Sequence, residues 1–329
     1  VRNGSVLAAS TYPSFDLSNY RKEFSELASQ KYSPLLYRPT QAALPPGSVF
    51  KLVTAVAGLE TGSISGATSF ECEGYNIYRG RRFNCTSQWG HGPVELVQAI
   101  RDSCNVYFFE AGRRIGGESL ADWAHRFGLG RPTGIRLPNR RTGHVPEPGS
   151  LFGTLNLAIG QGNILVTPLQ VARMVAGIAG GGRVPQVHFF QQARTPAGNA
   201  VARSRNESRR LDVSADVLRA VRKGMRRVVQ SGTAEGSGLD RFSAAGKTGT
   251  ASIRVDLNHA WFAGFAPFDQ PRVAFAVVNE RTPGHGGSHA APIAAHFFEQ
   301  TWDKLAPGEE DGQQMAAGSP PAGNANGSP

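Results

Sequence analysis

Two reactive side chains stand in an otherwise apolar stretch, LPPGSVFKLVTAVAGLE, at residues 44–60. Ser48 and Lys51 are three residues apart, and positions i and i+3 lie on the same face of a helix. A serine hydroxyl becomes a strong nucleophile when a neighbouring base removes its proton, and a lysine can be that base if burial lowers its pKa. Taken alone, the pair also fits a serine that caps the helix and a lysine that extends to solvent. Further motifs in the chain are needed to distinguish this structural interpretation from a catalytic one.

Two more motifs follow, in the order that one group of serine enzymes uses. The triplet SCN at residues 103–105 lies in a stretch with helical periodicity, and KTGT at residues 247–250 lies in a stretch rich in strand-forming residues. The set of an S-x-x-K, an S-x-N and a K-T-G motif is typical of β-lactamases and penicillin-binding proteins. Each motif is weak by itself, but together they favour a serine acyl-transfer enzyme.

The words around these motifs narrow the family. The chain resembles the transpeptidase domain of class B penicillin-binding proteins over about residues 4–304, and most of all the cell-elongation branch, in LPPGSVFK, GHG, SCNVYFFE, AIGQGNILVTPLQVA, AAGKTGTA and HAWFAGFAP. One departure is Tyr37, where the family usually has Asn before the arginine. The resemblance implies an α+β penicillin-binding, serine β-lactamase-like fold. In that fold helices cover an antiparallel sheet, and the active site lies between the sheet and an all-helical subdomain.

The residue chemistry and the resemblance together suggest catalytic roles. Ser48 is expected to attack an acyl carbonyl, with Lys51 as its general base. Ser103 is expected to relay a proton to the leaving amine, and Asn105 to hold Lys51 and the substrate amide by hydrogen bonds. Lys247 would offer a positive charge to a substrate carboxylate and tune the Ser103 hydroxyl.

The strand that carries the third motif is expected to bind substrate. Hydroxyls of Thr248 and Thr250 can bind the same carboxylate, and Gly249 leaves room for it. The backbone N–H groups of Ser48 and Thr250 would form the oxyanion hole, and a substrate backbone could pair with the strand edge. The GQG triplet at residues 160–162 fits a simple turn as well as a part in shaping the floor of the cleft.

By resemblance, the donor is a peptidoglycan stem peptide ending in D-Ala-D-Ala. Ser48 would form an acyl-enzyme that an amine of a neighbouring stem resolves into a cross-link, and β-lactams would acylate Ser48 as substrate mimics. A D,D-carboxypeptidase, a β-lactam sensor and a β-lactamase remain alternatives. A class A β-lactamase needs a glutamate for deacylation, and the one candidate, Glu147, lacks the usual asparagine spacing.

The resemblance also implies surroundings for the enzyme. It predicts a SEDS-family glycosyltransferase and the elongation complex as partners, in peptidoglycan biosynthesis and control of cell shape. It places the domain on the extracytoplasmic, periplasmic face of the cell inner membrane, held by an upstream anchor. The chain begins at Val1 without methionine, so we expect an excerpt or processed form of a longer protein.

Composition fits this interpretation and excludes others. The 329 residues are 40% hydrophobic with a formal net charge of +10, which suits a globular protein beside an anionic surface or polymer. The arginine clusters lack the aromatic interleaving of a single-strand binder, so we predict solvated surface and no nucleic acid partner. No run of 18 apolar residues is present. Residues 1–305 are expected to form the transpeptidase domain, and the polar tail 306–329 to be disordered.

Periodicity and turn residues predict the elements that position the motifs. Helices are expected from Ser48 to about Glu60, from Pro93 through the SCN motif to about 115, over 167–182 with a capping box, over 214–232 and over 291–305. Strands are expected at the front of the chain in SVLAAST and later over 242–254, 259–267 and 272–280, with a polar linker near 197–211. Short connections between the late strands favour an antiparallel sheet.

The insertion between the first two motifs contains a possible metal site. All three cysteines, Cys72, Cys85 and Cys104, fall within 33 residues together with His91, in the spacing C-x12-C-x5-H-x12-C. Three thiolates and an imidazole can complete a structural, tetrahedral Zn²⁺ site, while the chemistry itself requires no cofactor. A Cys72–Cys85 disulfide with Cys104 as a packed thiol, or three free thiols, are the alternatives.

Overall fold

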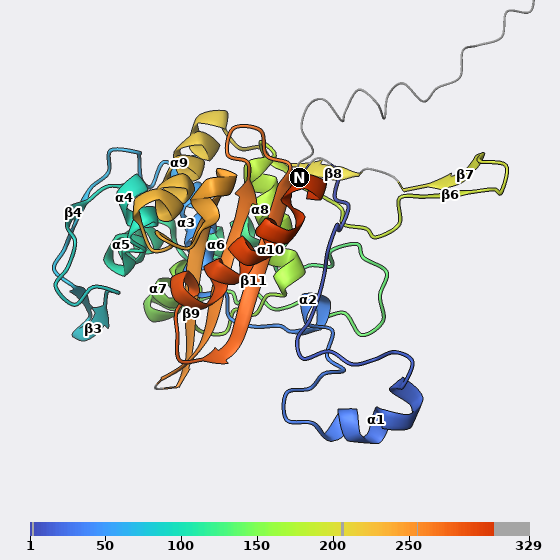
Figure 1. Cartoon of the computed structure of the whole chain (residues 1–329). Coiled ribbons are helices and arrows are strands. Elements are labelled where there is room, and N and C mark those ends of the chain that lie inside the picture. Colours follow the sequence, from blue (N-terminus) through green and yellow to red (C-terminus); the bar gives the residue numbers. More distant parts are fainter. Residues whose placement is uncertain (2, 205–206, 255, 306–329) are drawn as a thin grey trace, which may run out of the picture.

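The computed structural model describes residues 1–305 apart from residues 2, 205–206 and 255. The tail predicted to be disordered, residues 306–329, therefore lies outside the described residues. Helices surround one three-stranded sheet, and two segments project from this body, one around α1 and one formed by β6 and β7 (Figure 1).

The central sheet consists of the three late strands in the order β11-β10-β9, all antiparallel, as predicted. Their bounds are β9 Ala245–Arg254, β10 Leu257–Ala266 and β11 Val273–Thr282. Every residue of β10 from Asn258 to Ala266 is buried, so both faces of this strand are covered. α8 and α9 pack against the sheet, and α10 crosses in front of it (Figure 1).

Seven α-helices lie between the first motif and the sheet in the part of the chain that the structure describes, and they carry or support the site. They are α3 Lys51–Glu60, α4 Leu96–Arg101, α5 Asn105–Ile115, α6 Gly117–Arg126, α7 Leu151–Ala158, α8 Pro168–Ala179 and α9 Ala215–Ser231. The predicted capping box of α8 is confirmed: Thr167 and Gln170 bind each other's backbone N–H groups. α10, Ala291–Leu305, also forms as predicted.

The predicted long helix from Pro93 is wrong in two respects. Pro93 lies in strand β4, Gly92–Val94, because its backbone pairs with β1. The remainder is split into α4 and α5, since Ser103 adopts a positive φ of 57° that no α-helix accommodates. The first motif is also refined, because Ser48 lies on the 3₁₀ turn η1, Gly47–Phe50, and α3 starts only at Lys51.

The insertion after α3 contains four short strands. β1, Phe70–Cys72, pairs with β4, while β2, Tyr75–Tyr78, and β3, Arg81–Asn84, form a hairpin. Tyr78 and Phe83 of the hairpin pack against Phe109 of α5 in a small apolar cluster. The Tyr78 hydroxyl also donates to Glu110 Oε1 at 2.7 Å, so the hairpin is attached to the helix that begins at the second motif.

Two predictions on local structure are corrected by the remaining segments. SVLAAST is not a strand, because only Ser5 forms an isolated bridge, with His188, and no ladder follows. The polar linker contains two strands that pair with earlier residues. The remaining elements are α1 Tyr20–Ser29, α2 Arg38–Gln41, β5 Arg183–Pro185, β6 Gln192–Arg194, β7 Ala200–Arg203, β8 Ser208–Arg210, η2 Leu239–Phe242 and the short π-helix η3 Gly286–Ala290.

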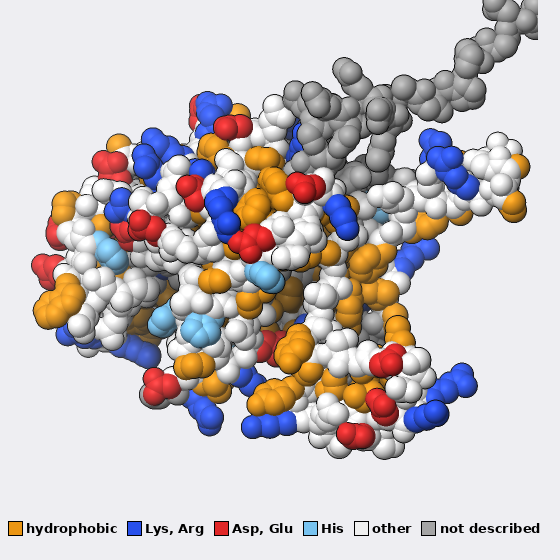
Figure 2. Space-filling view, viewed as in Figure 1, with side chains coloured by type: hydrophobic (Ala, Val, Ile, Leu, Met, Phe, Trp, Pro, Cys, Tyr) orange, Lys and Arg blue, Asp and Glu red, His pale blue; other side chains and the backbone are white. Residues whose placement is uncertain are grey.

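The surface carries most of the charge. Figure 2 shows Lys, Arg, Asp and Glu side chains spread over the visible face, and the described members of the arginine clusters are exposed, as predicted. Within the described part of the chain, no helix has the length and apolar character needed to cross a membrane.

Candidate active site

Ser48 is held in place by a close approach of three backbone segments. Gly47 N–H donates to the Gly160 carbonyl at 3.0 Å, and a Cβ added at Gly160 would lie 2.1 Å from the Gly47 oxygen. Both glycines have positive φ, 54° at Gly47 and 70° at Gly160. Only glycine permits this contact, which fixes the turn on which Ser48 stands half-buried.

Lys51 occupies the centre of the site. Its side chain is fully buried, and its amine donates to Asn105 Oδ1 at 2.6 Å, to the Ser103 carbonyl at 2.6 Å and to Ser103 Oγ at 3.1 Å. Burial lowers the pKa of Lys51 to about 8, against a smaller opposing effect of the thiols of Cys104 and Cys85. The amine is therefore partly neutral near neutral pH, as a general base requires.

The second motif reaches Lys51 because the chain turns between α4 and α5. The left-handed backbone of Ser103 directs both its carbonyl and its hydroxyl to the amine. Asn105 is the first residue of α5, and its Nδ2 donates to the Asn84 carbonyl at 3.1 Å. Thr86 Oγ1 donates to the Ser103 carbonyl at 3.4 Å, so the insertion supports the motif directly.

The third motif lies on β9. Lys247 is fully buried and donates to the Thr248 carbonyl at 3.1 Å and to Thr248 Oγ1 at 3.3 Å. Its pKa is held well below the ordinary range by burial first and by the charge of Lys51 second, while Asp102 opposes the shift. Among the described residues no hydrogen bond joins Lys247 to Ser103, while Lys51 hydrogen-bonds to Ser103 and also lowers the pKa of Lys247.

Two contacts at the site were not found by reading the sequence. Thr233 Oγ1 lies 2.6 Å from Thr248 Oγ1, and Gln161 Nε2 donates to the Thr250 carbonyl at 3.2 Å. Thr233 lies two residues after the end of α9, in the triplet SGT. A polar residue just after a helix is the feature of the sequence that could have marked it as a candidate site residue. Gln161 was noted only as part of the GQG turn, because nothing local indicates that it reaches β9.

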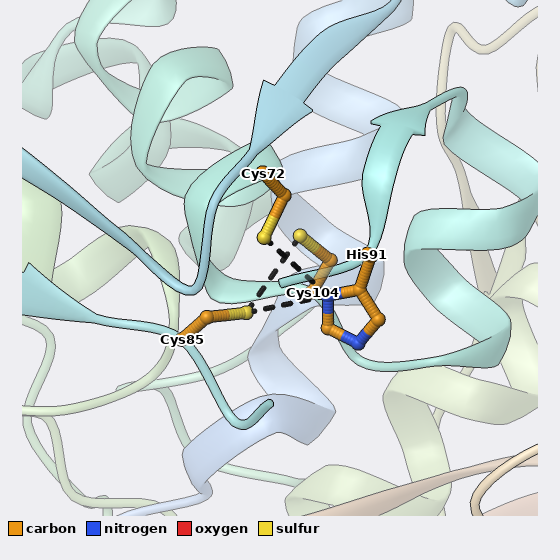
Figure 3. Close-up of side chains that lie close together, drawn as sticks. All are labelled: Cys72, Cys85, His91 and Cys104. Atoms are coloured by element: carbon orange, nitrogen blue, oxygen red, sulfur yellow. Dashed lines mark hydrogen bonds between the residues drawn. The ribbon is translucent and has the colours of Figure 1, made fainter. Parts of the chain in front are cut away.

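The three cysteines and His91 come together beside the second motif (Figure 3). The Sγ atoms of Cys72 and Cys85 lie 3.4 and 3.5 Å from His91 Nδ1, and the Sγ atoms of Cys85 and Cys104 are 3.8 Å apart. All four ligand atoms lie within 4.8 Å of one another. None of the cysteines forms a disulfide in the structure.

Charge at this cluster is unevenly shared. Hydrogen bonding from Cys104 lowers the pKa of Cys85, and the same contact raises the pKa of Cys104. The Asn105 N–H also donates to Cys85 Sγ at 3.2 Å, which favours a thiolate there. The cluster thus offers a thiolate next to a motif residue.

The arrangement can carry out nucleophilic acyl transfer. A hydroxyl stands one turn before a buried amine of lowered pKa, and that amine is bound to a second hydroxyl and an amide. The expected donor pair of Ser48 and Thr250 N–H groups comes from segments that lie side by side, since a Cβ built at Gly47, next to Ser48, would lie 3.1 Å from Thr250 N.

Comparison with known proteins gives a consistent result. The family model described as the penicillin binding protein transpeptidase domain matches residues 1–299. The chain is 31% identical over 330 residues to the peptidoglycan D,D-transpeptidase MrdA of Acinetobacter baumannii, covering 91% of this chain and 49% of that protein. It is 30% identical over 329 residues to the peptidoglycan D,D-transpeptidase PbpA of Mycobacterium tuberculosis, covering 90% of this chain and 64% of that one.

Solved structures agree with the fold. A complex between the penicillin-binding protein PBP2 and MreC from Helicobacter pylori matches with a TM-score of 0.82 and 29% identity, over 92% of this chain and 58% of that chain. Pseudomonas aeruginosa PBP2 in complex with WCK 5153 matches with a TM-score of 0.81 and 29% identity, over 92% and 71%. The chain spans about half the length of the first curated relatives that it matches.

Proposed function

Because the chain belongs to the penicillin-binding protein transpeptidase domain family, we propose that it is the catalytic part of a peptidoglycan D,D-transpeptidase of the elongation type. The observation that carries the proposal is the fully buried Lys51, bound to Ser103 and Asn105 one turn after Ser48. Within the part of the chain that the structure describes, this amine has hydroxyl, carbonyl and amide hydrogen-bond partners but no carboxylate partner. Such a buried amine contributes little to stability, whereas it suits a general base.

In the proposed reaction, Ser48 Oγ attacks the carbonyl of the penultimate D-Ala of a stem peptide, and Lys51 takes the hydroxyl proton. The N–H groups of Ser48 and Thr250 stabilise the oxyanion. Ser103 donates its proton to the departing D-Ala amine and regains one from protonated Lys51, the C–N bond breaks, and Ser48 carries the acyl group. An amine of a second stem then attacks this ester, and Ser48 recovers its proton.

The third motif is proposed to hold the substrate carboxylate. Lys247, Thr248 and Thr250 supply the positive charge and hydroxyls, and Gly249 leaves the strand open at that point. Lys247 donates two hydrogen bonds to Thr248, and a substrate carboxylate beside it would favour its protonated form against the effect of burial. A β-lactam has a carboxylate and a strained amide in a similar arrangement, and would acylate Ser48 by the same steps.

The β-lactamase alternative is disfavoured by the position of Glu147. This residue is exposed, and the neighbouring Pro148 packs at Gly117, at the start of α6. Among the described residues, Glu147 forms no hydrogen bond or ion pair with Ser48 or Lys51, so this position does not support a role in activating a deacylating water. A D,D-carboxypeptidase and a β-lactam sensor use the same acylation step and are separated from a transpeptidase by the fate of the acyl-enzyme.

Labelling with a fluorescent penicillin tests acylation. Ser48→Ala removes one oxygen at a turn whose backbone contacts do not involve it, so the variant should keep its melting temperature and lose covalent labelling. Labelling of the variant at unchanged stoichiometry would show that the nucleophile is another residue. Incubation of the longer protein with lipid-linked precursor and a polymerase then separates the activities, because only a transpeptidase yields cross-linked dimers.

The matched structures support a proposal about the partners and the location of this activity. One matched structure is a complex of PBP2 with MreC, and another comes from work on a peptidoglycan synthase complex that couples polymerization and crosslinking. We propose that the longer protein works on the extracytoplasmic face of the membrane, with a SEDS-family glycosyltransferase and the elongation complex. Co-purification of the longer protein with such a polymerase is the direct measurement.

We also propose that Cys72, Cys85, His91 and Cys104 hold a structural Zn²⁺. In a tetrahedral site with Zn–S near 2.3 Å and Zn–N near 2.0 Å, neighbouring sulfurs are about 3.8 Å apart and a sulfur and nitrogen about 3.5 Å. Three separations here match these values: 3.8 Å between the sulfurs of Cys85 and Cys104, and 3.4 and 3.5 Å from the sulfurs of Cys72 and Cys85 to His91 Nδ1. All four ligand atoms lie within 4.8 Å of one another. The donors thus fit the ion in type, number and spacing.

Such an ion would tie the insertion to the second motif without taking part in catalysis. Protein purified without chelator should contain one zinc per chain, and Cys72→Ser should reduce it and lower the melting temperature. Cys72 is the suitable variant because Cys85 accepts a hydrogen bond from the motif residue Asn105, and Cys104 is itself part of the motif. Absence of zinc together with three titratable thiols, or a disulfide between two of them, would refute the metal site.

A further inference from the structure

Gln161 is held over β9 by a rigid turn. Its backbone N–H donates to the Asn156 carbonyl at 2.9 Å, and Gly160 N–H donates to the Leu157 carbonyl at 2.8 Å, so the residue is tied to the end of α7. Gly160 in turn accepts from Gly47 at 3.0 Å. The half-buried Gln161 side chain therefore starts from a fixed point, and its amide reaches Thr250, 89 residues away in the sequence.

The Thr250 carbonyl belongs to the free edge of the sheet. β9 is an edge strand in the described part of the chain, paired only with β10. A Cβ built at Gly47 would lie 2.6 Å from Thr250 O and 3.1 Å from Thr250 N, so both atoms lie next to η1. The hydrogen bond from Gln161 Nε2 shows that the carbonyl accepts from outside the sheet. An extended peptide that adds to this edge beside Ser48 needs that carbonyl as an acceptor for its own N–H.

We propose that Gln161 is a specificity-determining residue. In the free enzyme its side-chain amide donates a hydrogen bond to the Thr250 carbonyl, and the backbone N–H of a bound donor peptide takes over this hydrogen bond. The proposal rests on the acyl-transfer function proposed above. An unpaired carbonyl at a half-buried edge is unfavourable, and Gln161 satisfies it in the free enzyme. A ligand that brings an amide N–H replaces one hydrogen bond by another, whereas a ligand without one loses little by leaving Gln161 in place.

Two classes of β-lactam separate these cases. Benzylpenicillin carries an acylamino N–H next to its ring, as a stem peptide does, while a carbapenem carries a hydroxyethyl group at that position. Both acylate the same serine and both have a carboxylate. If Gln161 competes for the Thr250 carbonyl, removal of its side-chain amide should increase the acylation rate constant of the penicillin and leave that of the carbapenem unchanged.

The experiment measures the second-order acylation rate constants of both compounds for the wild type, Gln161→Met and Gln161→Glu. Neither replacement can donate to a carbonyl when the carboxylate is ionised. We expect the penicillin constant to rise by about 2- to 10-fold, which is the range of one net hydrogen bond. The carbapenem constant should stay within about 2-fold of the wild type. Asn163→Ala, an exposed change in the same loop, should alter neither.

The ratio of the penicillin constant to the carbapenem constant decides the outcome. Both compounds react only with folded protein, so any loss of folded protein in a variant lowers both constants equally and leaves their ratio unchanged. A raised ratio in both Gln161 variants supports the proposal. An unchanged ratio assigns Gln161 to the fold alone, and a lowered ratio means that it helps to bind the amide; either result overturns the proposal. Failure of both compounds to acylate the wild-type protein would instead refute the proposed function.

Discussion

At the scale of single residues, Lys51 has the most unusual environment among the described residues of the site. It is fully buried among the apolar residues of α3, with a pKa lowered to about 8 and with Ser103 and Asn105 as partners. At pH 7 about a tenth of such an amine is neutral, against less than about a thousandth for an ordinary lysine. The burial that makes the helix stable is therefore also the source of the base.

Lys51→Arg tests this role directly. A guanidinium stays protonated, so it keeps the charge and loses the base, and acylation by a penicillin should fall by about 10²- to 10⁴-fold. In the wild type the rate should increase as the pH rises toward about 8, where Lys51 loses its proton, and level off above it. A near-normal rate for the arginine variant, or a flat wild-type profile from pH 6 to 9, would place the base elsewhere.

At the scale of elements, the site depends on direct backbone contacts between three segments. The turn η1, the end of α7 at Gly160 and strand β9 approach so closely that Gly47 contacts both neighbours by backbone alone. This contact sets the distance between Ser48 on η1 and Thr250 on β9. A change in any one segment should therefore move the proposed oxyanion donors apart.

Gly160→Ala tests the three-segment contact, with Gly62→Ala as its matched control. Both positions have similar φ, 70° and 68°, so both variants carry the cost of a left-handed alanine, about 1–2 kcal/mol. Only at Gly160 would the new Cβ meet the Gly47 oxygen, at 2.1 Å, while nothing lies within 4 Å at Gly62. Melting temperature and acylation rate should fall clearly further for Gly160→Ala; equal losses would mean that backbone strain alone is responsible.

At the scale of the whole molecule, two buried lysines work against stability. Lys51 and Lys247 both have pKa values lowered by burial, and the charge of Lys51 lowers the pKa of Lys247 further. A lysine whose pKa falls on folding binds fewer protons in the folded than in the unfolded chain between about pH 8 and its ordinary value. Over this window the free energy of unfolding should therefore increase with pH.

Lys51→Met removes the contribution of Lys51 to the pH dependence of the free energy of unfolding. Urea unfolding at pH 7, 8, 9 and 10 should show the wild type gaining stability relative to the variant as pH rises, by at most about 3 kcal/mol in total. The loss of hydrogen bonds to Ser103 and Asn105 shifts the variant equally at every pH and does not affect this trend. Parallel curves for the two proteins would mean that Lys51 has no lowered pKa.

The sequence by itself determined the features that depend on neighbours along the chain. Three motifs in order identified the family, strand-forming runs predicted β9, β10 and β11, and a capping box predicted the start of α8. Such patterns are readable because helices and strands repeat over a few residues. The same reasoning joined α4 and α5 into one helix, since the left-handed Ser103 between them has no local signal.

Only the tertiary structure decided which distant groups meet. Lys51 reaches partners 52 and 54 residues away, and Gln161 reaches a carbonyl 89 residues away. The four possible metal ligands come from a strand, two loop positions and a helix cap, and their spacing in the sequence fits no standard zinc motif. These contacts are set by the packing of helices and sheet around a shared core, and that packing depends on the whole chain and not on any local period.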